Sequence, residues 1–320
     1  MPGLATNFSP SASLLADVLL AGAVIAWAIR SASSAQVIDS RHHPRQRLTH
    51  WQAVRVDDMT ADQNRTAGPV ATDGLQRQLA EAFEMTVAAG AGGSGIAAAD
   101  EADHIAALAS GLRKADITGT AGVSDEVPPP ATVTERLPGL LADMTASPLA
   151  DLLRPLAGQL DWYQIFEHGY APDSLSNGMM AGQVIGGRGL LQSRDYYFGL
   201  FLVAPHVTYP LHQHAALEIY CVLSGEVSIR HGRDKPPMRI TAGGYSVTPP
   251  YQVHELRTGE SACLMAYGWT GDLVGENWWW EEQSDGSWDR VCWRRMPDSS
   301  WQISERETLS EEEVRRAGDR

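Results

Sequence analysis

One short segment holds the residues with the clearest capacity for chemistry. Residues 209–220 read Tyr-Pro-Leu-His-Gln-His-Ala-Ala-Leu-Glu-Ile-Tyr. In a β-strand, side chains two residues apart share a face, so His212, His214 and Glu218 would point the same way. Two imidazoles and a carboxylate are costly in a hydrophobic core but suit a divalent metal ion. His254, forty residues after His214, is the candidate fourth ligand from another strand.

The spacing of these residues resembles the two sequence motifs of the cupin superfamily. The first motif is His-x-His, three or four residues, Glu, six residues and Gly. The residues that match it here are His212, His214, Glu218 and Gly225. The second motif is matched by Gly243, Pro249 and His254. The resemblance implies a jelly-roll β-barrel in which the two histidines of the first motif, Glu218 and His254 hold a metal ion.

Three positions depart from the cupin motifs. His206 and Tyr251 stand where the motifs have glycine, and Thr258 stands where the second motif has asparagine. None of the three is a metal ligand. The departures therefore concern the local geometry of the turns and leave the predicted metal site intact.

The ligand set does not specify which metal is bound. A site of histidine and carboxylate with open positions suits Fe2+, Zn2+, Mn2+, Ni2+ or Co2+, and availability decides among them. A bound metal of this kind can polarise a carboxylate or a carbonyl, or it can activate oxygen. We therefore expect one divalent transition metal as the cofactor.

Tyr220 distinguishes this segment from a strand that only binds metal. It lies two residues beyond Glu218 and would share the face of the ligands. A nearby cation favours the phenolate form, so Tyr220 could act as a base near neutral pH. The alternative is a core tyrosine with a hydrogen-bonded hydroxyl. We favour the catalytic interpretation because perturbed groups cluster at such sites.

A closer resemblance is to the bacterial cupin lyases of dimethylsulfoniopropionate (DMSP). It is carried by Tyr209-x-x-His-x-His-x-x-x-Glu-x-Tyr220, by Pro-Pro-Tyr-Gln-Val-His254, and by Trp269 fifteen residues later. In that family, DMSP is cleaved to dimethyl sulfide and acrylate. The resemblance implies that Tyr220 is the base, with Tyr209 as a second candidate or a substrate anchor, and that Trp269 lines the pocket.

The residues are chemically consistent with a β-elimination. The metal can take the carboxylate of the zwitterionic substrate and acidify the adjacent C–H, a tyrosinate can remove that proton, and dimethyl sulfide leaves. An aromatic wall suits the sulfonium through a cation–π contact, and Trp269 and Tyr267 are the candidates for it. Two alternatives remain open: a cupin oxygenase or isomerase acting on another small carboxylate, and a non-catalytic cupin that binds small molecules.

The rest of the chain predicts an α+β protein with a helical N-terminal part packed on a C-terminal cupin barrel. We expect a leader over residues 1–58 that is dispensable for catalysis, a helical region over 59–175, the barrel over 176–305 and a polar tail over 306–320. Apolar residues at helical spacing support the helices. They include Leu75, Leu79, Phe83 and Val87, then Ile105, Leu108 and Leu112, then a helix capped by Ser147 and begun by Pro148.

Short β runs with Gly and Pro punctuation follow from about residue 183. The strands are expected at residues 183–191, 196–203, 213–223, 226–231, 237–241, 244–249 and 262–269, with a hairpin turn at Ser224-Gly225. His231 falls in this region, and we interpret it as an ordinary hydrogen-bonded core histidine.

Composition limits the partners and the compartment. A net charge of −14 argues against a nucleic-acid partner, since phosphate backbones attract clustered Lys and Arg. Three cysteines without CxxC spacing indicate reduced thiols in the cytoplasm. The apolar segment at 14–29 leaves a membrane anchor or export signal as the alternative. The expected partner is a small zwitterionic or carboxylate substrate, and a homodimer is left open.

Overall fold

The computed structural model describes residues 72–93, 97–120, 129–166, 171–274, 276–295 and 301–319. The expected leader over residues 1–58, with its apolar segment at 14–29, lies outside these residues, so its predicted dispensability stays a prediction. The other predicted region boundaries also stay predictions. None of the helices in the described residues combines the length and hydrophobicity needed to cross a membrane.

Helices come first along the described chain, and strands follow. The helices are α2 (Thr72–Ala89), α3 (Ala98–Lys114), α4 (Ala131–Ala142), α5 (Pro148–Leu153), α6 (Asp173–Ser176) and α7 (Glu311–Asp319), with a short 3-10 helix at Ala157–Gln159. The predicted cap of α5 is confirmed: the Ser147 side chain accepts a hydrogen bond from the Ala150 amide, and Pro148 occupies the first turn. The predicted stripe of α2 is buried, and Leu108 and Leu112 of α3 are fully buried.

The strands of the described residues form a nine-stranded and a seven-stranded sheet. The nine-stranded sheet contains β1 (Ala91–Gly92), β2 (Gly119–Thr120), β3 (Trp162–Gln164), β4 (Met179–Ile185), β5 (Leu191–Gln192), β6 (Tyr196–Val203), β8 (Ala216–Ser224), β11 (Gly244–Thr248) and β13 (Cys263–Gly271). The seven-stranded sheet contains β7 (Thr208–His214), β9 (Glu226–His231), β10 (Met238–Thr241), β12 (His254–Arg257), β14 (Asn277–Glu282), β15 (Trp288–Arg295) and β16 (Trp301–Thr308).

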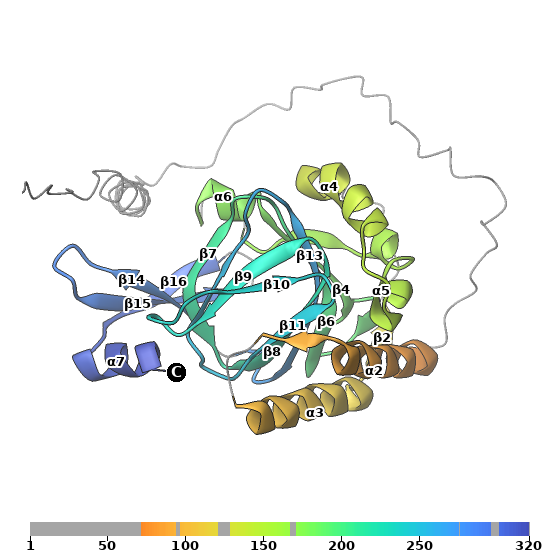
Figure 1. The fold of residues 1–320 in the computed structure, drawn as a ribbon, viewed down its shortest axis with the longest axis horizontal. Coiled ribbons are helices and arrows are strands. Elements are labelled where there is room, and N and C mark those ends of the chain that lie inside the picture. Colours follow the sequence, from red (N-terminus) through yellow and green to blue (C-terminus); the bar gives the residue numbers. More distant parts are fainter. Residues whose placement is uncertain are drawn as a thin grey trace, which may run out of the picture. The chain divides into compact units, whose positions relative to one another are not determined.

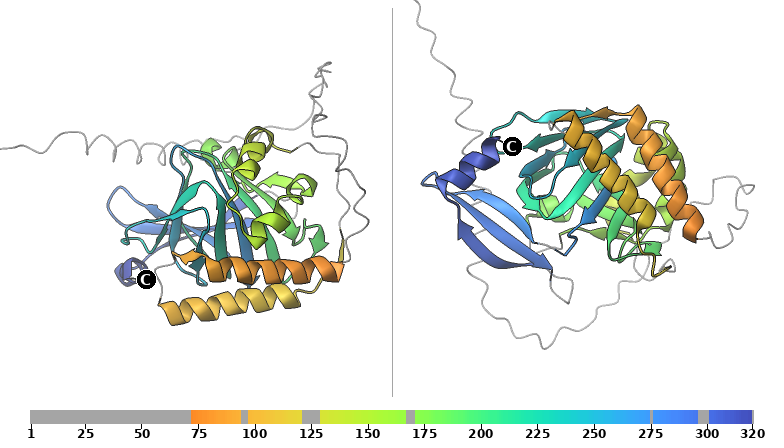
Figure 2. Two further views of the ribbon diagram at one scale, coloured as in Figure 1. Left: turned by 45° about the vertical axis from the view of Figure 1, so that its right-hand side comes forward. Right: turned by 90° about the horizontal axis from the view of Figure 1, so that it is seen from below.

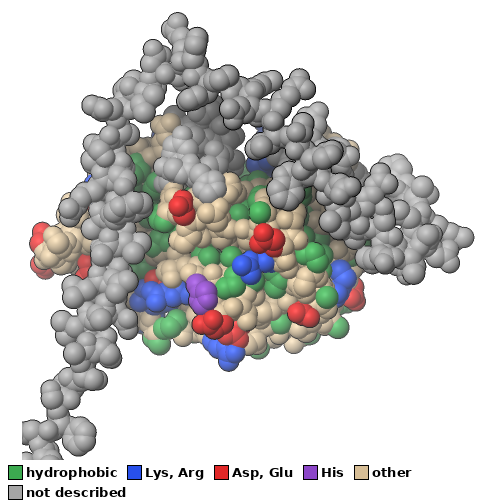
Figure 3. Space-filling view, turned by 90° about the horizontal axis from the view of Figure 1, so that it is seen from above, with side chains coloured by type: hydrophobic (Ala, Val, Ile, Leu, Met, Phe, Trp, Pro, Cys, Tyr) green, Lys and Arg blue, Asp and Glu red, His purple; other side chains and the backbone are tan. Residues whose placement is uncertain are grey.

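The two sheets face each other, and helices α2, α3 and α5 lie on the outer side of the nine-stranded sheet (Figures 1 and 2). Helix α3 packs on β6, β8, β11 and β13, and α2 packs on α3 and α5. The α+β prediction, with N-terminal helices on a cupin-like β-sandwich, is therefore confirmed. The space-filling face in Figure 3 shows acidic and basic side chains side by side over its described part.

Strand β8 separates two hydrophobic clusters. Leu217, Ile219 and Cys221 point outward into the cluster that includes Leu108 of α3. Tyr220 belongs to the interior cluster between the sheets. The period of two along a strand thus places one set of β8 side chains under the helices and the other set inside the barrel.

Two predicted strands differ from the structure. The run 183–191 is not one strand, because β4 ends at Ile185 and Gly186 turns the chain with φ of +147°. The run 213–223 is divided at Ala215, because the chain passes there from β7 in one sheet to β8 in the other. The other predicted strands match observed strands to within two residues. The predicted turn at Gly225 has φ of +76°.

The two residues that replace cupin glycines, His206 and Tyr251, keep the positive φ that glycine usually adopts. His206 and Tyr251 have φ of 58° and 60°, and they are the non-glycine residues with positive φ in the described chain. Such a conformation costs roughly 1–2 kcal/mol for an L-residue. Thr258 supports the first of these turns, since its hydroxyl donates to the Ala204 carbonyl at 2.6 Å and accepts from the Val207 amide at 3.1 Å.

The C-terminal strands and helix lie at the edge and on the outer side of the seven-stranded sheet. Strands β14, β15 and β16 extend the seven-stranded sheet beyond β7, and α7 follows them (Figure 1). Leu309 and Ala317 pack with Leu211, Val253 and Trp280 in a small separate cluster. This cluster lies on the outward side of the strands that carry the predicted histidine ligands, so it holds those strands from behind.

Candidate metal centre

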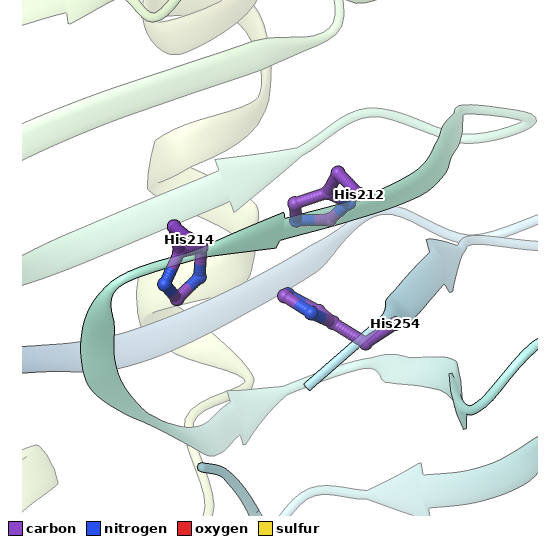
Figure 4. Close-up of side chains that lie close together, drawn as sticks. All are labelled: His212, His214 and His254. Carbon is purple, nitrogen blue, oxygen red and sulfur yellow. The ribbon is translucent and has the colours of Figure 1, made fainter. Parts of the chain in front are cut away.

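Three of the predicted ligands form a buried cluster. His212 and His214 come from β7, and His254 comes from the neighbouring β12, where it lies directly opposite His212 in the ladder (Figure 4). One ring nitrogen from each histidine lies within 4.8 Å of the others. The three side chains are at most 4 % exposed, so the cluster is closed to bulk water.

Backbone carbonyls fix the orientation of each imidazole ring. The Nδ1 atoms of His212, His214 and His254 lie 2.7, 3.0 and 2.9 Å from the carbonyl oxygens of Pro210, Ala216 and Gln252. A carbonyl can only accept, so each Nδ1 carries the proton and each Nε2 is left with a lone pair. This is the arrangement in which proteins present histidine to a metal.

The fourth predicted ligand, Glu218, enters the cluster from the other sheet. It is fully buried in β8, and its Oε2 lies 3.5 Å from His214 Nε2 and 3.3 Å from His254 Nε2. None of these three atoms has a hydrogen-bond partner among the described residues. The other carboxylate oxygen, Oε1, accepts a hydrogen bond from the indole N–H of Trp269.

The electrostatics of the cluster favour an ionised Glu218 carboxylate and a neutral His212 imidazole. Burial alone would raise the pKa of Glu218, but His214 and His254 hold it well below its usual range. Burial lowers the pKa of His212, and the neighbouring His254 and His214 lower it further. The carboxylate and the imidazole lone pair are the forms that bind metal.

The residues present fit a divalent metal ion. A buried carboxylate oxygen and two buried imidazole nitrogens that face each other without hydrogen bonds are costly, unless something positively charged lies between them. Three nitrogens and one oxygen are also the donor set that iron, zinc, manganese, nickel and cobalt share. The buried cluster of His212, His214 and His254 is therefore consistent with a metal site, and Glu218 as the fourth ligand stays a prediction.

Tyr209 reaches the same chamber through an irregularity in the ladder. Tyr209 and His212 are three residues apart, so strict alternation along the strand would place them on opposite faces. The register between β12 and β7 shifts, so that Leu256 pairs with Tyr209 while His254 pairs with His212. The Tyr209 ring stacks on the His212 ring with 3.8 Å between centroids. Its hydroxyl accepts from the Asn277 amide at 3.3 Å.

Tyr220 lies on the interior face of β8, two residues beyond Glu218, and is 6 % exposed. Its ladder neighbours are Tyr267 of β13 and Ser246 of β11. Burial raises the pKa of Tyr220 well above its usual range, and the charge of Glu218 raises it further. Burial likewise raises the pKa of Tyr209, whereas the Asn277 hydrogen bond opposes the rise. Without a metal ion, the protein alone therefore keeps both phenols protonated.

The two predicted aromatic residues of the substrate pocket also line the interior. Trp269 lies opposite Glu218 in the β8–β13 ladder, and its ring faces His214 with 4.3 Å between centroids. Tyr267 lies beside Tyr220 and is 9 % exposed. Burial raises its pKa well above the ordinary value, and the neighbouring Tyr163 adds to the rise.

Two further interior residues come from β14 and were not singled out from the sequence. Asn277 pairs with His214 in the ladder, and Trp279 pairs with His212. The usable signal in the sequence is the alternation along β14, which places residues 277 and 279 on the same face. His231 is confirmed as a hydrogen-bonded core residue, since its Nε2 lies 3.0 Å from the Thr248 hydroxyl.

A two-sheet barrel with inward-facing histidines and a glutamate defines a protein of the cupin superfamily. The family model for dimethylsulfoniopropionate lyase matches residues 107–265, the segment that holds most of the barrel and all four predicted ligands. The chain belongs to this DMSP lyase family.

Individual relatives are similar over shorter stretches. DddL of Cereibacter sphaeroides, a protein assigned as a DMSP lyase, is 32% identical over 123 residues, which are 37% of this chain and 49% of DddL. The DMSP lyase DddQ of Ruegeria pomeroyi is 38% identical over 66 residues, which are 20% of this chain and 32% of DddQ. The matches thus span about half or less of the curated relatives. The crystal structure of DddQ aligns with a TM-score of 0.42 at 22% identity, over 57% of this chain and 96% of DddQ.

Proposed function

We propose that this protein is a metal-dependent lyase that cleaves DMSP to dimethyl sulfide and acrylate by base-catalysed β-elimination. The observation that carries the proposal is the burial, between the two sheets, of a three-histidine and glutamate cluster together with two tyrosines. Membership of the DMSP lyase family supports the same reaction.

His212, His214, His254 and Glu218 would hold one divalent transition metal. When bound, such an ion supplies positive charge that can polarise the carboxylate of a substrate and favour loss of the adjacent proton. The same charge would offset the influence of Glu218, which otherwise raises the pKa of Tyr220. Both sheets contribute to the set, since the histidines lie in the seven-stranded sheet and Glu218 lies in the nine-stranded sheet.

Tyr220 is the proposed base, and Tyr209 is the second candidate or a substrate anchor. Tyr220 lies on the face of Glu218, in the ladder beside Tyr267, so its hydroxyl shares the interior with the metal ligands. Tyr209 stacks on His212 and is held by Asn277, a geometry that also suits an anchor. The proton taken from the carbon next to the carboxylate would move to the phenolic oxygen, and it must pass to solvent before the next turnover.

The interior suits the sulfonium end of the substrate as well. Tyr267 and Trp269 present aromatic surface close to the proposed base, and a cation over such a ring gains about 0.5–2 kcal/mol. The chamber is closed to bulk water, which strengthens each electrostatic contact within it. We further infer a cytoplasmic protein, since Cys221, Cys263 and Cys292 are free and buried.

The test is to incubate metal-loaded protein with DMSP and to measure dimethyl sulfide in the headspace while recording oxygen consumption. Release of dimethyl sulfide and acrylate in equal amounts, without oxygen uptake, is the expected result. Oxygen uptake with a small carboxylate would favour the oxygenase alternative. No turnover of DMSP or other small acids, with tight binding of one of them, would favour a binding protein.

A further inference from the structure

Trp269 makes two contacts with the metal ligands, and both involve specific atoms. Its indole N–H donates to Glu218 Oε1, and its ring lies over the His214 ring at 4.3 Å and an interplanar angle of 33°. The two residues of the hydrogen bond are direct neighbours in the β8–β13 ladder, so the backbone of the sheet holds donor and acceptor together.

We propose that Trp269 is a positioning residue that orients Glu218 for metal binding. A fully buried carboxylate has two equivalent oxygens and could rotate to bind a metal through either or both. The indole N–H commits Oε1, which leaves Oε2 as the atom that faces His214 and His254. Groups that hydrogen-bond a metal ligand in this way fix its geometry and raise its affinity.

Two other indoles of the interior cluster show that this contact is specific. Trp279 and Trp293 are also buried beside the chamber, with 5.0 Å between their ring centroids. The indole nitrogen of Trp293 has no hydrogen-bond partner among the described residues, and that of Trp279 interacts with Tyr209 and not with a carboxylate. Within this cluster, Trp269 is the tryptophan whose N–H contacts the carboxylate of a metal ligand, so its role differs from that of a packed aromatic wall.

The test measures metal affinity without substrate, and it rests on the proposed metal site but not on the lyase reaction. Co2+ is titrated into metal-free protein, and its binding is followed by visible absorption and by competition with a chelator. Trp269→Phe keeps a ring over His214 and removes the N–H. The Kd for Co2+ should rise by roughly 10–100-fold, the range found for such supporting contacts. Trp293→Phe, the matched control, should leave the Kd within about twofold on the same argument.

The route through Glu218 is tested by a double-mutant cycle. In a Glu218→Ala background, Trp269→Phe should not weaken Co2+ binding further. A full additional loss in that background would show that Trp269 acts through His214 and would overturn the proposal, as would wild-type affinity in Trp269→Phe itself. Should Trp269→Phe fail to fold, benzothienylalanine at position 269 replaces the N–H by sulfur at constant shape. It must reproduce the weakened binding.

Discussion

The outer and inner faces of the nine-stranded sheet come from the same strands but differ in what their side chains do. On the outer face, apolar residues of β8 such as Ile219 pack against Leu108 and Leu112 of α3, all at most 1 % exposed. On the inner face of the same strand, Glu218 contacts histidines of the other sheet, and Tyr220 lies in the interior cluster. The outer face contributes burial of apolar surface, and the inner face concentrates polar groups that this burial must offset.

The comparison implies that the two faces respond differently to substitution. Removing an outer side chain leaves a cavity and costs stability without changing the metal ligands. Removing an inner polar side chain acts on the proposed metal site directly, and its cost in stability depends on whether it leaves a buried partner unpaired. Five predictions, taken from the largest expected effect to the smallest, test this separation.

Removing a metal ligand should have the largest effect. His254→Ala is expected to reduce metal content to background, because it deletes one of three imidazoles within 4.8 Å of each other. Elemental analysis of purified protein measures this, with Leu108→Ala as the control that keeps its metal. Full occupancy in His254→Ala would show that the cluster is not the metal site.

Removing the hydroxyl of the base should come next. Tyr220→Phe keeps the ring, so metal loading should persist while turnover of DMSP falls by about 10²-fold or more. Tyr209→Phe is the companion variant, since Tyr209 stacks on His212 in the same chamber. Near wild-type turnover in Tyr220→Phe with a dead Tyr209→Phe would reverse the assignment, and normal turnover in both would exclude the tyrosine-based elimination.

A cavity on the outer face of the sheet should lower stability without affecting metal binding. Leu108 is fully buried between α3 and the sheet, so Leu108→Ala should lower the free energy of unfolding by about 2–5 kcal/mol. Urea denaturation measures the change. The Kd for Co2+ should stay at the wild-type value, and a parallel loss of affinity would show that the two faces are coupled.

The contact between Tyr245 and Glu101 gives a smaller, pH-dependent effect. The Tyr245 hydroxyl donates to the Glu101 carboxylate at 2.9 Å, and burial followed by this bond raises the pKa of Tyr245 to about 12. In the unfolded chain the phenol titrates near pH 10. The contribution of the Tyr245–Glu101 hydrogen bond to folding stability is therefore complete below about pH 10, and it is lost as the pH rises through about 12. Tyr245→Phe should cost about 1 kcal/mol at neutral pH.

The measurement is urea denaturation at several pH values between neutral and alkaline. Wild-type stability should decline more steeply than that of Tyr245→Phe between about pH 10 and 12. Equal slopes would show that this phenol does not link α3 to the sheet in solution.

The smallest effect is expected at the strained turn that precedes His254. Tyr251 has φ of 60° and is 59% exposed, so Tyr251→Gly relieves backbone strain and loses little packing. The greater entropy of unfolded glycine offsets part of the gain, which leaves a stabilisation of at most about 1 kcal/mol. Tyr251→Val should instead destabilise, because a β-branched residue tolerates this conformation poorly. A glycine variant less stable than the valine variant would contradict the assigned strain.

The histidine and glutamate cluster could be predicted from sequence because the alternation of inward-facing residues is the same on β7 and on β8, although these are separate strands. Alternation correctly groups His212 with His214 on β7, and Glu218 with Tyr220 on β8. It does not predict the bend at Ala215, since a single alanine carries no turn signal of its own. The two residues of β7 and the two of β8 converge because each strand directs these side chains to the interior of the sandwich. They do not lie on one continuous strand.

Other parts of the site depend on long-range pairing that local patterns do not encode. The inward position of Tyr209 depends on a register shift against β12, a contact between residues about fifty positions apart in the sequence. Asn277 and Trp279 reach the chamber because β14 pairs with β7, and the tryptophan run alone equally fits simple packing. Strand pairing decided both cases, and a single sequence gives weak evidence about it.

The crossing at Ala215 gives the metal site a mechanical consequence. His212, His214 and His254 belong to one sheet and Glu218 to the other, so an ion held by all four would cross-link the two halves of the sandwich. Such a cross-link binds the folded state and not the unfolded chain, and at one hundred times its Kd it would add about 2.7 kcal/mol to stability. The melting temperature should therefore rise with metal concentration, and chelation should loosen the sandwich where the sheets meet before the helix-covered face opens.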